Sequence, residues 1–578
     1  MNNRILADSA QRQAIVENLE QNYFVEAGAG SGKTQSLVGR IIALVKSGTA
    51  TMEEVTAITF TRKAAGELKE RLQIELEKAV SKAASETSRK RLETALEHLD
   101  RCFIGTIHSF CSSILRERPV EAGLDPNFTT IEGLEERFLE RQAWDGFILD
   151  QFLHNRTFLD ELSEIDIDPR QLFEAYRTMN LYPEVEKVLT TVPRPTVGQQ
   201  RQQLLDFARK AEQNMPYQEP EPEWDSLQKK VRKILSWNRI FDLQNDVIFL
   251  RLLAELETPK AAVTQKRWLN GPLAKDLKNQ YEQLWEHSLK PLLVSWREYR
   301  YPFLIRFLEA AERYYRELRL AENKLNFQDL LMHCAALLRD NAEVRAYFQR
   351  RYPRLLVDEF QDTDPIQAQI MMYLSGEDCW EKDWTRLKPR PGSLFVVGDP
   401  KQSIYRFRRA DIDTFQRVRE QIAAGGGKVL TLSTNFRAHI ELVQWINGTF
   451  EPLFQAMPTP YQAPYQHMQA AVELIHSDGA LQVLPAVEPG SDIKPSAKED
   501  AQRVAAWIKT TLEKGLNLSA ADGSKTVKPL QPQDILLLMQ YKKDMLIYAQ
   551  ALQAQGIPYS ISGGSDLSSS FLVEELHY

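Results

Sequence analysis

Eight consecutive residues near the amino terminus combine the chemical groups that bind a phosphate chain. Residues 27–34 read AGAGSGKT, between a short apolar run at 23–26 and a helical pattern at 35–45. Glycines let the backbone curl until several N–H groups point at phosphate oxygens, and the following helix adds its positive dipole. We expect Lys33 to reach the β- and γ-phosphates of a nucleotide, and the Thr34 hydroxyl to coordinate Mg²⁺. The predicted nucleotide-binding loop comprises Ala27, Gly28, Ala29, Gly30, Ser31, Gly32, Lys33 and Thr34, with Ala27 in place of the usual first glycine.

A second segment supplies two adjacent acids. The apolar run Leu355-Leu356-Val357 is followed by Asp358 and Glu359. Ligands of open parallel sheets bind beyond the carboxyl ends of the strands, so both carboxylates are expected at that edge. Asp358 is predicted to hold the Mg²⁺ through a water, and Glu359 to orient or deprotonate an attacking water. An Asp-Glu pair after a strand is common and weak alone; its pairing with the loop at Lys33 makes it specific.

These residues need a parallel sheet to position them. Short apolar runs, each a predicted strand and most followed by a helical pattern, occur at residues 23–26, 55–60, 103–108, 355–360, 394–399 and 429–433. Alternating strands and helices predict an α/β fold with a parallel sheet. Residues 109–325 carry long helical patterns and a proline-rich acidic break at 216–223, so they are predicted to be a mostly helical insertion.

The remaining chain is predicted to begin a second α/β domain. We expect residues 1–108 and 326–434 to form the first domain, 109–325 the insertion, and 435–578 an incomplete second domain. Strands are predicted there at 480–484 and 534–540, and a strand with a turn at 557–564. At 578 residues, three or four domains fit the length.

Composition and charge indicate a globular protein and argue against a membrane-spanning or disulfide-rich one. The chain is 43% hydrophobic and 26% charged, as in a globular protein, and contains no apolar run long enough to span a bilayer. Its polar start lacks a signal-peptide core, so a cytoplasmic location and no membrane partner are expected. Four scattered cysteines predict buried free thiols, not a disulfide framework. The net charge of −7 argues against coating DNA through bulk charge but permits a local basic track.

Six motifs in order resemble those of UvrD/Rep-type superfamily 1 DNA helicases. Beyond the phosphate-binding loop, the matching segments are QRQA at 11–14, TFTRKAA at 59–65, GTIHSF at 105–110, DEFQD at 358–362, GDPKQSIYRFR at 398–408 and NFR at 435–437. The resemblance implies two RecA-like domains, with ATP and Mg²⁺ as cofactors. It implies 3′ to 5′ movement along DNA, with single-stranded DNA or a duplex with a single-stranded tail as the partner. It also implies a role in DNA repair or recombination.

The resemblance also assigns roles to single residues. Gln11 is expected to read the adenine edge with its amide, and Phe436 to stack on the base. Gln402 and Arg437 are expected to sense the γ-phosphate and, with Lys33, Asp358 and Glu359, to form the catalytic set. The predicted DNA contacts are Phe60, Thr61, Arg62, His108, Tyr405, Phe407 and Arg408. Aromatic rings stack on bases regardless of sequence. A plain core role stays open for Phe60, Phe407 and His108, as does a solvated helix start for Arg62.

Two family motifs, T-x-H-x-x-K-G-L-E and Y-V-A-x-T-R-A, have no match after residue 564. We therefore expect a truncated chain that binds nucleotide, hydrolyses it poorly and unwinds DNA weakly or not at all. Cys111 and the long insertion resemble the RecB/AddA branch, whose members often carry a nuclease and work with a partner subunit. This leaves open a complete motor, the motor subunit of a helicase–exonuclease complex, and a fragment that binds ATP and DNA without unwinding.

Overall fold

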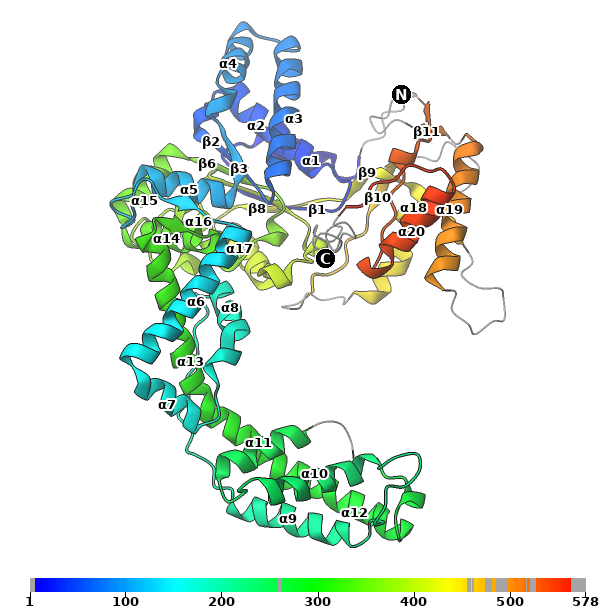
Figure 1. The fold of residues 1–578 in the computed structure, drawn as a ribbon. Coiled ribbons are helices and arrows are strands. Elements are labelled where there is room, and N and C mark those ends of the chain that lie inside the picture. Colours follow the sequence, from blue (N-terminus) through cyan, green and yellow to red (C-terminus); the bar gives the residue numbers. More distant parts are fainter. Residues whose placement is uncertain are drawn as a thin grey trace, which may run out of the picture. The chain divides into compact units, whose positions relative to one another are not determined.

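The computed structural model describes residues 6–257, 261–454, 459, 462–472, 481–484, 496–515, 517–519 and 527–562. The chain divides into two compact units, which are considered separately (Figure 1). The sheet unit comprises residues 1–111 and 335–578, and the helical unit comprises residues 112–334. Across the described ranges, no helix combines the length and the apolar character needed to cross a bilayer.

The sheet unit is built on six parallel strands in the order β3-β2-β6-β7-β1-β8. Their bounds are β1 Tyr23–Ala27, β2 Val55–Thr59, β3 Phe103–Thr106, β6 Arg354–Val357, β7 Leu394–Gly398 and β8 Lys428–Leu432. All six occupy predicted strand positions, within a few residues at each end. The predicted α/β class with a parallel central sheet is confirmed.

Helices cover both faces of this sheet (Figure 1). They are α1 Ser9–Glu17, α2 Lys33–Ser47, α3 Arg62–Ser81, α4 Glu86–Glu97, α5 Ile107–Glu117, α14 Phe327–Asp340, α15 Ala342–Arg351, α16 Pro365–Ser375 and α17 Ile412–Ala424. Side chains alternate along β1, so Tyr23 and Val25 pack into a core with α2, α3 and α4. Phe24 points to the other face, against Phe415 of α17. The central strands β1, β2, β6 and β7 are therefore largely buried on both sides, which explains their continuous apolar sequences, while the edge strands β3 and β8 are partly exposed.

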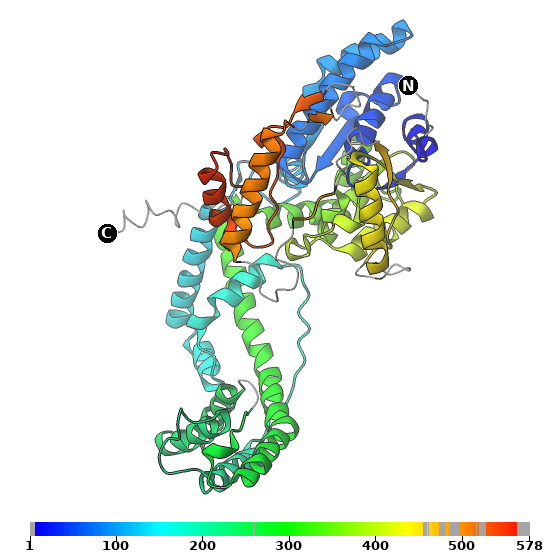
Figure 2. The same cartoon turned by 90° about the vertical axis from the view of Figure 1, so that its right-hand side faces the viewer.

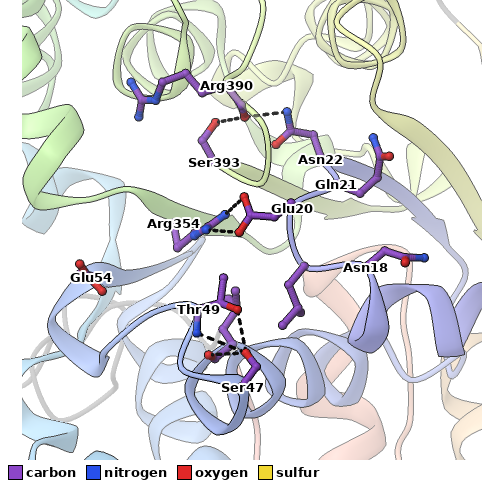
Figure 3. Close-up of polar contacts among 12 residues, drawn as sticks. Asn18, Glu20, Gln21, Asn22, Ser47, Thr49, Glu54, Arg354, Arg390 and Ser393 are labelled. Atoms are coloured by element: carbon purple, nitrogen blue, oxygen red, sulfur yellow. Dashed lines mark hydrogen bonds and ion pairs between the residues drawn. The ribbon is translucent and has the colours of Figure 1, made fainter.

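Polar contacts hold the amino-terminal edge of the sheet together (Figure 3). Asn22 donates to the carbonyl oxygens of Pro389 and Arg390, and its own side-chain oxygen accepts from Leu394 N. Arg354 of β6 forms an ion pair with Glu20 at 2.7 Å. These contacts join residues more than three hundred positions apart in the sequence, and the bond between Leu394 N and the Asn22 side chain ties the start of β7 to the residue before β1.

Three predicted strands in the carboxyl-terminal part are wrong wherever the structure describes them. Residues 481–484, 534–540 and 557–562 form no strand, while Ala480, Gly563 and Gly564 lie outside the described residues. Ile535 and Ile557 pack on the helices α19 Ala497–Glu513 and α20 Met545–Ala554. Leu536 and Leu538, however, are 86% and 93% exposed. Apolar composition favours a strand, but a strand also needs a hydrogen-bonded neighbour, and the described residues supply none here.

The other elements of this part are short. They are α18 Ile440–Phe450, β9 Thr434–His439 paired with β10 Gln469–Val472, and β11 Asn517–Ser519 paired with β12 Val527–Pro529. The β9 strand was not predicted. It matters because it begins directly after β8 and carries residues 435–437.

The helical unit has a core of its own. Its elements are α6 Leu134–His154, α7 Arg156–Glu164, α8 Phe173–Leu181, α9 Gly198–Glu212, α10 Ser226–Ile240, α11 Asp246–Leu256, α12 Gly271–Leu284, α13 Lys290–Ala321 and the two-residue strands β4 Thr129–Thr130 and β5 Lys324–Leu325. The long helix α13, green in Figure 2, packs against α6, with Phe147 and Phe307 ring centroids 5.2 Å apart. Residues 216–223 form the predicted irregular, mostly exposed loop.

Candidate nucleotide and DNA site

The predicted phosphate-binding loop lies between the carboxyl end of β1 and the first residue of α2, Lys33. Gly30 and Gly32 have φ angles of 73° and 82°, which strongly favour glycine. A Cβ atom on Gly30 would lie 2.8 Å from Asn435 Oδ1 and 2.9 Å from Arg437 Cβ. The glycines therefore provide both the curl of the loop and the room for residues 435–437 beside it. Ala27, at the position of the missing glycine, is buried at the end of β1.

The loop meets the acidic pair of β6 through one short contact. Lys33 Nζ lies 2.6 Å from Glu359 Oε2, and the same oxygen accepts a hydrogen bond of 2.7 Å from Gln361 Nε2. Glu359 has a φ of 51°, a conformation that non-glycine residues rarely adopt and that often marks functional sites. The fold therefore holds this carboxylate in a strained position against the loop lysine.

Asp358 provides a half-buried carboxylate next to this pair. Burial, and then the neighbouring charge of Glu359, raise its pKa to about 6, while Lys33 acts in the opposite direction. A cation beside Asp358 would favour the ionised form. Thr34, the other predicted Mg²⁺ ligand, lies half-buried in the first turn of α2. No group of three or more His, Cys, Asp or Glu side chains in the described ranges could hold a metal. The residues fit Mg²⁺, which takes few protein ligands and completes its shell with phosphates and water.

The end of β7 brings Gln402 into the same network. Gln402 Nε2 donates to Asp399 Oδ2 at 2.7 Å, and Lys401 Nζ contacts the other carboxylate oxygen at 2.9 Å. Gln361 accepts from Asp399 N at 2.8 Å and, through its carbonyl oxygen, from the Ser403 hydroxyl at 3.0 Å. Gln361 thus connects Glu359 to the segment that contains Gln402. The sequence places Gln361 within the DEFQD motif, but no role was predicted for it.

Residues 435–437 of β9 lie against the phosphate-binding loop. Asn435 Nδ2 donates to Ala29 O at 2.7 Å, and Phe436 N donates to Gly30 O at 2.8 Å. The Phe436 side chain is 37% exposed. Arg437 is also exposed, beside Gly30. The structure therefore places Phe436 and Arg437 at the loop, and it adds Asn435, whose contact spans 406 positions and has no local sequence signal.

Helix α1 completes the surroundings of the loop. The side-chain oxygen of Gln11 is buried and has no hydrogen-bond partner among the described residues. A buried acceptor without a partner is costly, so this atom is available to a donor on a ligand. Arg12, next to it, donates to Ser31 O at 2.8 Å. Sequence reasoning missed Arg12, because nothing in the sequence shows which side chain of α1 faces Ser31.

Four of the predicted DNA contacts form one cluster. The rings of Phe60, after β2, and Tyr405, after β7, are stacked with centroids 5.3 Å apart. Phe407 lies 5.8 Å from Tyr405, and the Arg408 guanidinium lies over both of these rings. Phe407 is 71% exposed, which is unusual for a core residue. The exposed ring of Phe407 and the half-buried rings of Phe60 and Tyr405, beside an arginine, offer a surface on which bases can stack.

Thr61, Arg62 and His108 lie near the start of α3 and α5. The Thr61 hydroxyl accepts a hydrogen bond from Ala64 N at 3.0 Å and caps α3. Burial, and then the charge of Arg62, lower the pKa of His108 to about 4. His108 is therefore neutral near neutral pH, so it can stack or form a neutral hydrogen bond but cannot attract phosphate as a cation. The roles of all these residues remain predictions.

Known proteins resemble the chain over most of its length. The UvrD/REP helicase N-terminal domain matches residues 7–423. An ATP-dependent helicase/nuclease subunit of Ligilactobacillus salivarius is 26% identical, covering 98% of this chain and 49% of that protein. Proteins of the same name from Enterococcus faecalis and Carboxydothermus hydrogenoformans are 25% and 27% identical, covering 96% and 97% of this chain and 48% and 51% of their own length. The chain thus spans about half the length of these relatives.

Proposed function

Because the chain belongs to the UvrD/REP helicase family, as its motifs predicted, we propose that it is the ATP-binding part of a DNA helicase. The proposed reaction is ATP hydrolysis coupled to 3′ to 5′ movement along single-stranded DNA in repair or recombination. Residues 1–108 and 326–434 would form the first RecA-like domain, 109–325 the inserted helical domain, and 435–578 an incomplete second RecA-like domain.

The contact between Lys33 Nζ and Glu359 Oε2, at 2.6 Å, carries this proposal. It joins the phosphate-binding loop to the carboxylate best placed to activate water. The phosphates of ATP offer Lys33 a partner of higher negative charge. Once Lys33 turns to them, Glu359 is free to accept a proton from the attacking water. The exposed guanidinium of Arg437 and the amide of Gln402 provide donors for the γ-phosphate oxygens.

Thr34 and Asp358 are the residues that would hold Mg²⁺ with ATP. The ion would supply positive charge to the transferred phosphoryl group. Asp358, whose pKa of about 6 reflects burial and the nearby Glu359, would then be held ionised. Lys33 and the loop N–H groups would bind the phosphate chain from the other side.

The stacked rings of Phe60 and Tyr405, with Phe407 and Arg408, support the proposal that single-stranded DNA is the partner. Gln361 provides a physical connection from this cluster to the nucleotide site. It contacts Glu359 through its side chain and the Ser403 hydroxyl through its backbone. A change at Glu359 during hydrolysis would therefore reach the loop that carries Tyr405.

A second candidate function is the motor subunit of a helicase–nuclease complex. The observation that favours it is the name of the relatives, which describes each of those proteins as one subunit of an ATP-dependent helicase/nuclease. Purification of the natural protein with a bound second subunit, together with DNA degradation that needs ATP, would support this candidate. A lone protein that moves on DNA without degrading it would support the simpler helicase.

The test is binding of a fluorescent ATP analogue with Mg²⁺ by the purified chain, followed by hydrolysis with and without single-stranded DNA. We expect Lys33→Ala to abolish binding. Lys46→Ala, at the exposed end of the same helix, is the matched control and should bind normally. DNA-stimulated hydrolysis would assign a working motor to this chain, and binding alone would assign it nucleotide binding without a working motor. ATP binding that does not depend on Lys33 would contradict the proposal.

A further inference from the structure

An ion pair between Asp8, the residue before α1, and Arg12 of α1 joins three separate segments around the nucleotide loop. Arg12 donates to both carboxylate oxygens of Asp8, at 2.9 and 2.8 Å. The same carboxylate, which is 1% exposed, accepts from Thr434 N at 3.0 Å and from the Thr434 hydroxyl at 2.8 Å. Burial by itself raises the pKa of Asp8, but the hydrogen bonds from Arg12 and Thr434 outweigh it and hold the pKa below its ordinary value. Asp8 therefore stays ionised and ties α1 to the first residue of β9.

The guanidinium of Arg12 reaches two further groups. It donates to Ser31 O at 2.8 Å, and its Cζ atom lies 4.9 Å from the centroid of the Phe436 ring. A Cβ atom on Gly32 would lie 3.5 Å from Arg12 Nη1 and 3.9 Å from Phe436 Cδ2. Arg12 and Phe436 therefore meet directly beside the phosphate-binding loop. Arg12 covers one face of the ring, and the remaining exposed surface of Phe436 is available to a base.

We infer that Arg12 is a positioning residue that determines specificity for the adenine base, holding Gln11 and Phe436 in fixed places relative to the phosphate-binding loop. Gln11 precedes Arg12 on α1, so the contacts of Arg12 to Ser31 and Phe436 set the distance of the Gln11 amide from the loop. The buried, unpartnered oxygen of Gln11 is an acceptor that suits the exocyclic amino group of adenine and not the carbonyl of guanine. This inference rests on the proposed binding of ATP.

The chemistry requires arginine at this position. A planar guanidinium can bind a carboxylate with two donors, reach a carbonyl oxygen with the same group and lie flat over an aromatic ring. Lysine keeps the charge but offers a single ammonium, which cannot make all of these contacts together. A base pocket assembled from three chain segments loses its geometry when one of these contacts is lost. The phosphate-binding loop itself is held by other contacts, including that of Asn435 with Ala29.

The test compares Arg12→Met with the unchanged chain in competition binding against a fluorescent ATP analogue. The competitors are ATP, GTP and inorganic tripolyphosphate, which lacks a base. We expect Arg12→Met to weaken ATP binding about 10-fold and to lower the preference for ATP over GTP by a similar factor, because the variant loses the hydrogen bonds and the cation–π contact that orient the base site. Tripolyphosphate binding should stay within about twofold, because its contacts are made by Lys33 and the loop.

Arg141→Met is the matched control. Arg141 forms the same type of ion pair, with Asp145 four residues later at 3.0 Å, and lies 4.7 Å from the centroid of Phe173. It belongs to the helical unit, so its loss should leave all three competitors unchanged. Two further variants protect the test if Arg12→Met does not fold. Arg12→Lys and Asp8→Asn should each reduce the preference for ATP while circular dichroism shows a folded chain.

The outcomes separate this inference from the proposed function. An unchanged preference for ATP over GTP in Arg12→Met and Arg12→Lys would overturn the inference, as would equal weakening of ATP and tripolyphosphate. An unmodified chain that binds ATP and GTP equally would overturn it as well. Absence of any Lys33-dependent binding, even of tripolyphosphate, would instead show that the proposed function is wrong.

Discussion

Glu359→Gln should separate nucleotide binding from hydrolysis, because the carboxylate has opposite effects on the two steps. In the free site Glu359 is the partner of Lys33, and a bound triphosphate must take that lysine away. A hydrogen bond between two charged groups contributes about 1.5–3 kcal/mol. Glu359 is 35% exposed and Lys33 is 11% exposed, so water screens the pair, and we reduce this value to about 1 kcal/mol. Removing the charge should therefore tighten ATP binding about fivefold.

Hydrolysis should change in the other direction. Without a carboxylate to accept the proton of the attacking water, kcat should fall by about 10²- to 10⁴-fold. Equilibrium titration with a fluorescent ATP analogue measures the first effect, and phosphate release in the presence of single-stranded DNA measures the second. The binding measurement is informative even if hydrolysis by this chain is slow.

The control for this variant is Glu20→Gln. Glu20 pairs with Arg354 at 2.7 Å on the amino-terminal edge of the same sheet, away from the nucleotide loop (Figure 3). Its loss should alter neither binding nor hydrolysis. Weaker ATP binding in Glu359→Gln would refute the idea that Glu359 competes with the phosphates for Lys33. A kcat within a few-fold of the unchanged chain would refute its role as the base.

Three further predictions concern single side chains. Tyr405→Ala removes a ring stacked on Phe60 and should weaken oligothymidylate binding about 10- to 100-fold in fluorescence anisotropy, since base stacking contributes about 1–3 kcal/mol. Trp380→Ala removes an exposed ring elsewhere and should leave binding unchanged, so equal losses in the two variants would contradict the prediction. The pKa of His108 is about 4 in the folded chain, below its ordinary 6.5, so the unfolded chain takes up the proton first as the pH falls. The folded state therefore loses stability between pH 6.5 and about pH 4. Between about pH 7 and about pH 5, the free energy of unfolding in urea should therefore fall by about 2 kcal/mol less in His108→Gln than in the unchanged chain. Equal falls in the two proteins would show that the His108 ring is not held neutral by the fold. Arg40→Met removes the buried guanidinium that donates to four carbonyl oxygens around the end of α1, and it should lower the free energy of unfolding in urea by about 3 kcal/mol. An unchanged urea midpoint would show that water replaces these hydrogen bonds.

Local sequence was sufficient to predict the positions of chemical groups that lie close together along the chain. The loop of residues 27–34 needs a strand before it, a helix after it and glycines between, and all three can be recognised in the sequence. Asp358 and Glu359 could be placed at a strand end for the same reason. The prediction was wrong at residues 534–540, where an apolar run suggested a strand. A strand depends on a neighbouring strand that is often far away in the chain, and composition does not reveal whether one is present.

The sequence by itself determined the parallel sheet and the family, and it predicted the phosphate-binding loop and the acidic pair, because each is recognisable in short segments of adjacent residues. Only the tertiary structure decided which of these groups touch. The contact of Lys33 with Glu359 spans 326 positions, and that of Asn435 with Ala29 spans 406. The strained φ of Glu359, the neutral state of His108 and the position of Arg12 against Phe436 likewise depend on burial and on neighbours brought together by folding. Hydrogen bonds and desolvation act over a few ångströms in space, so distance along the chain carries no information about them.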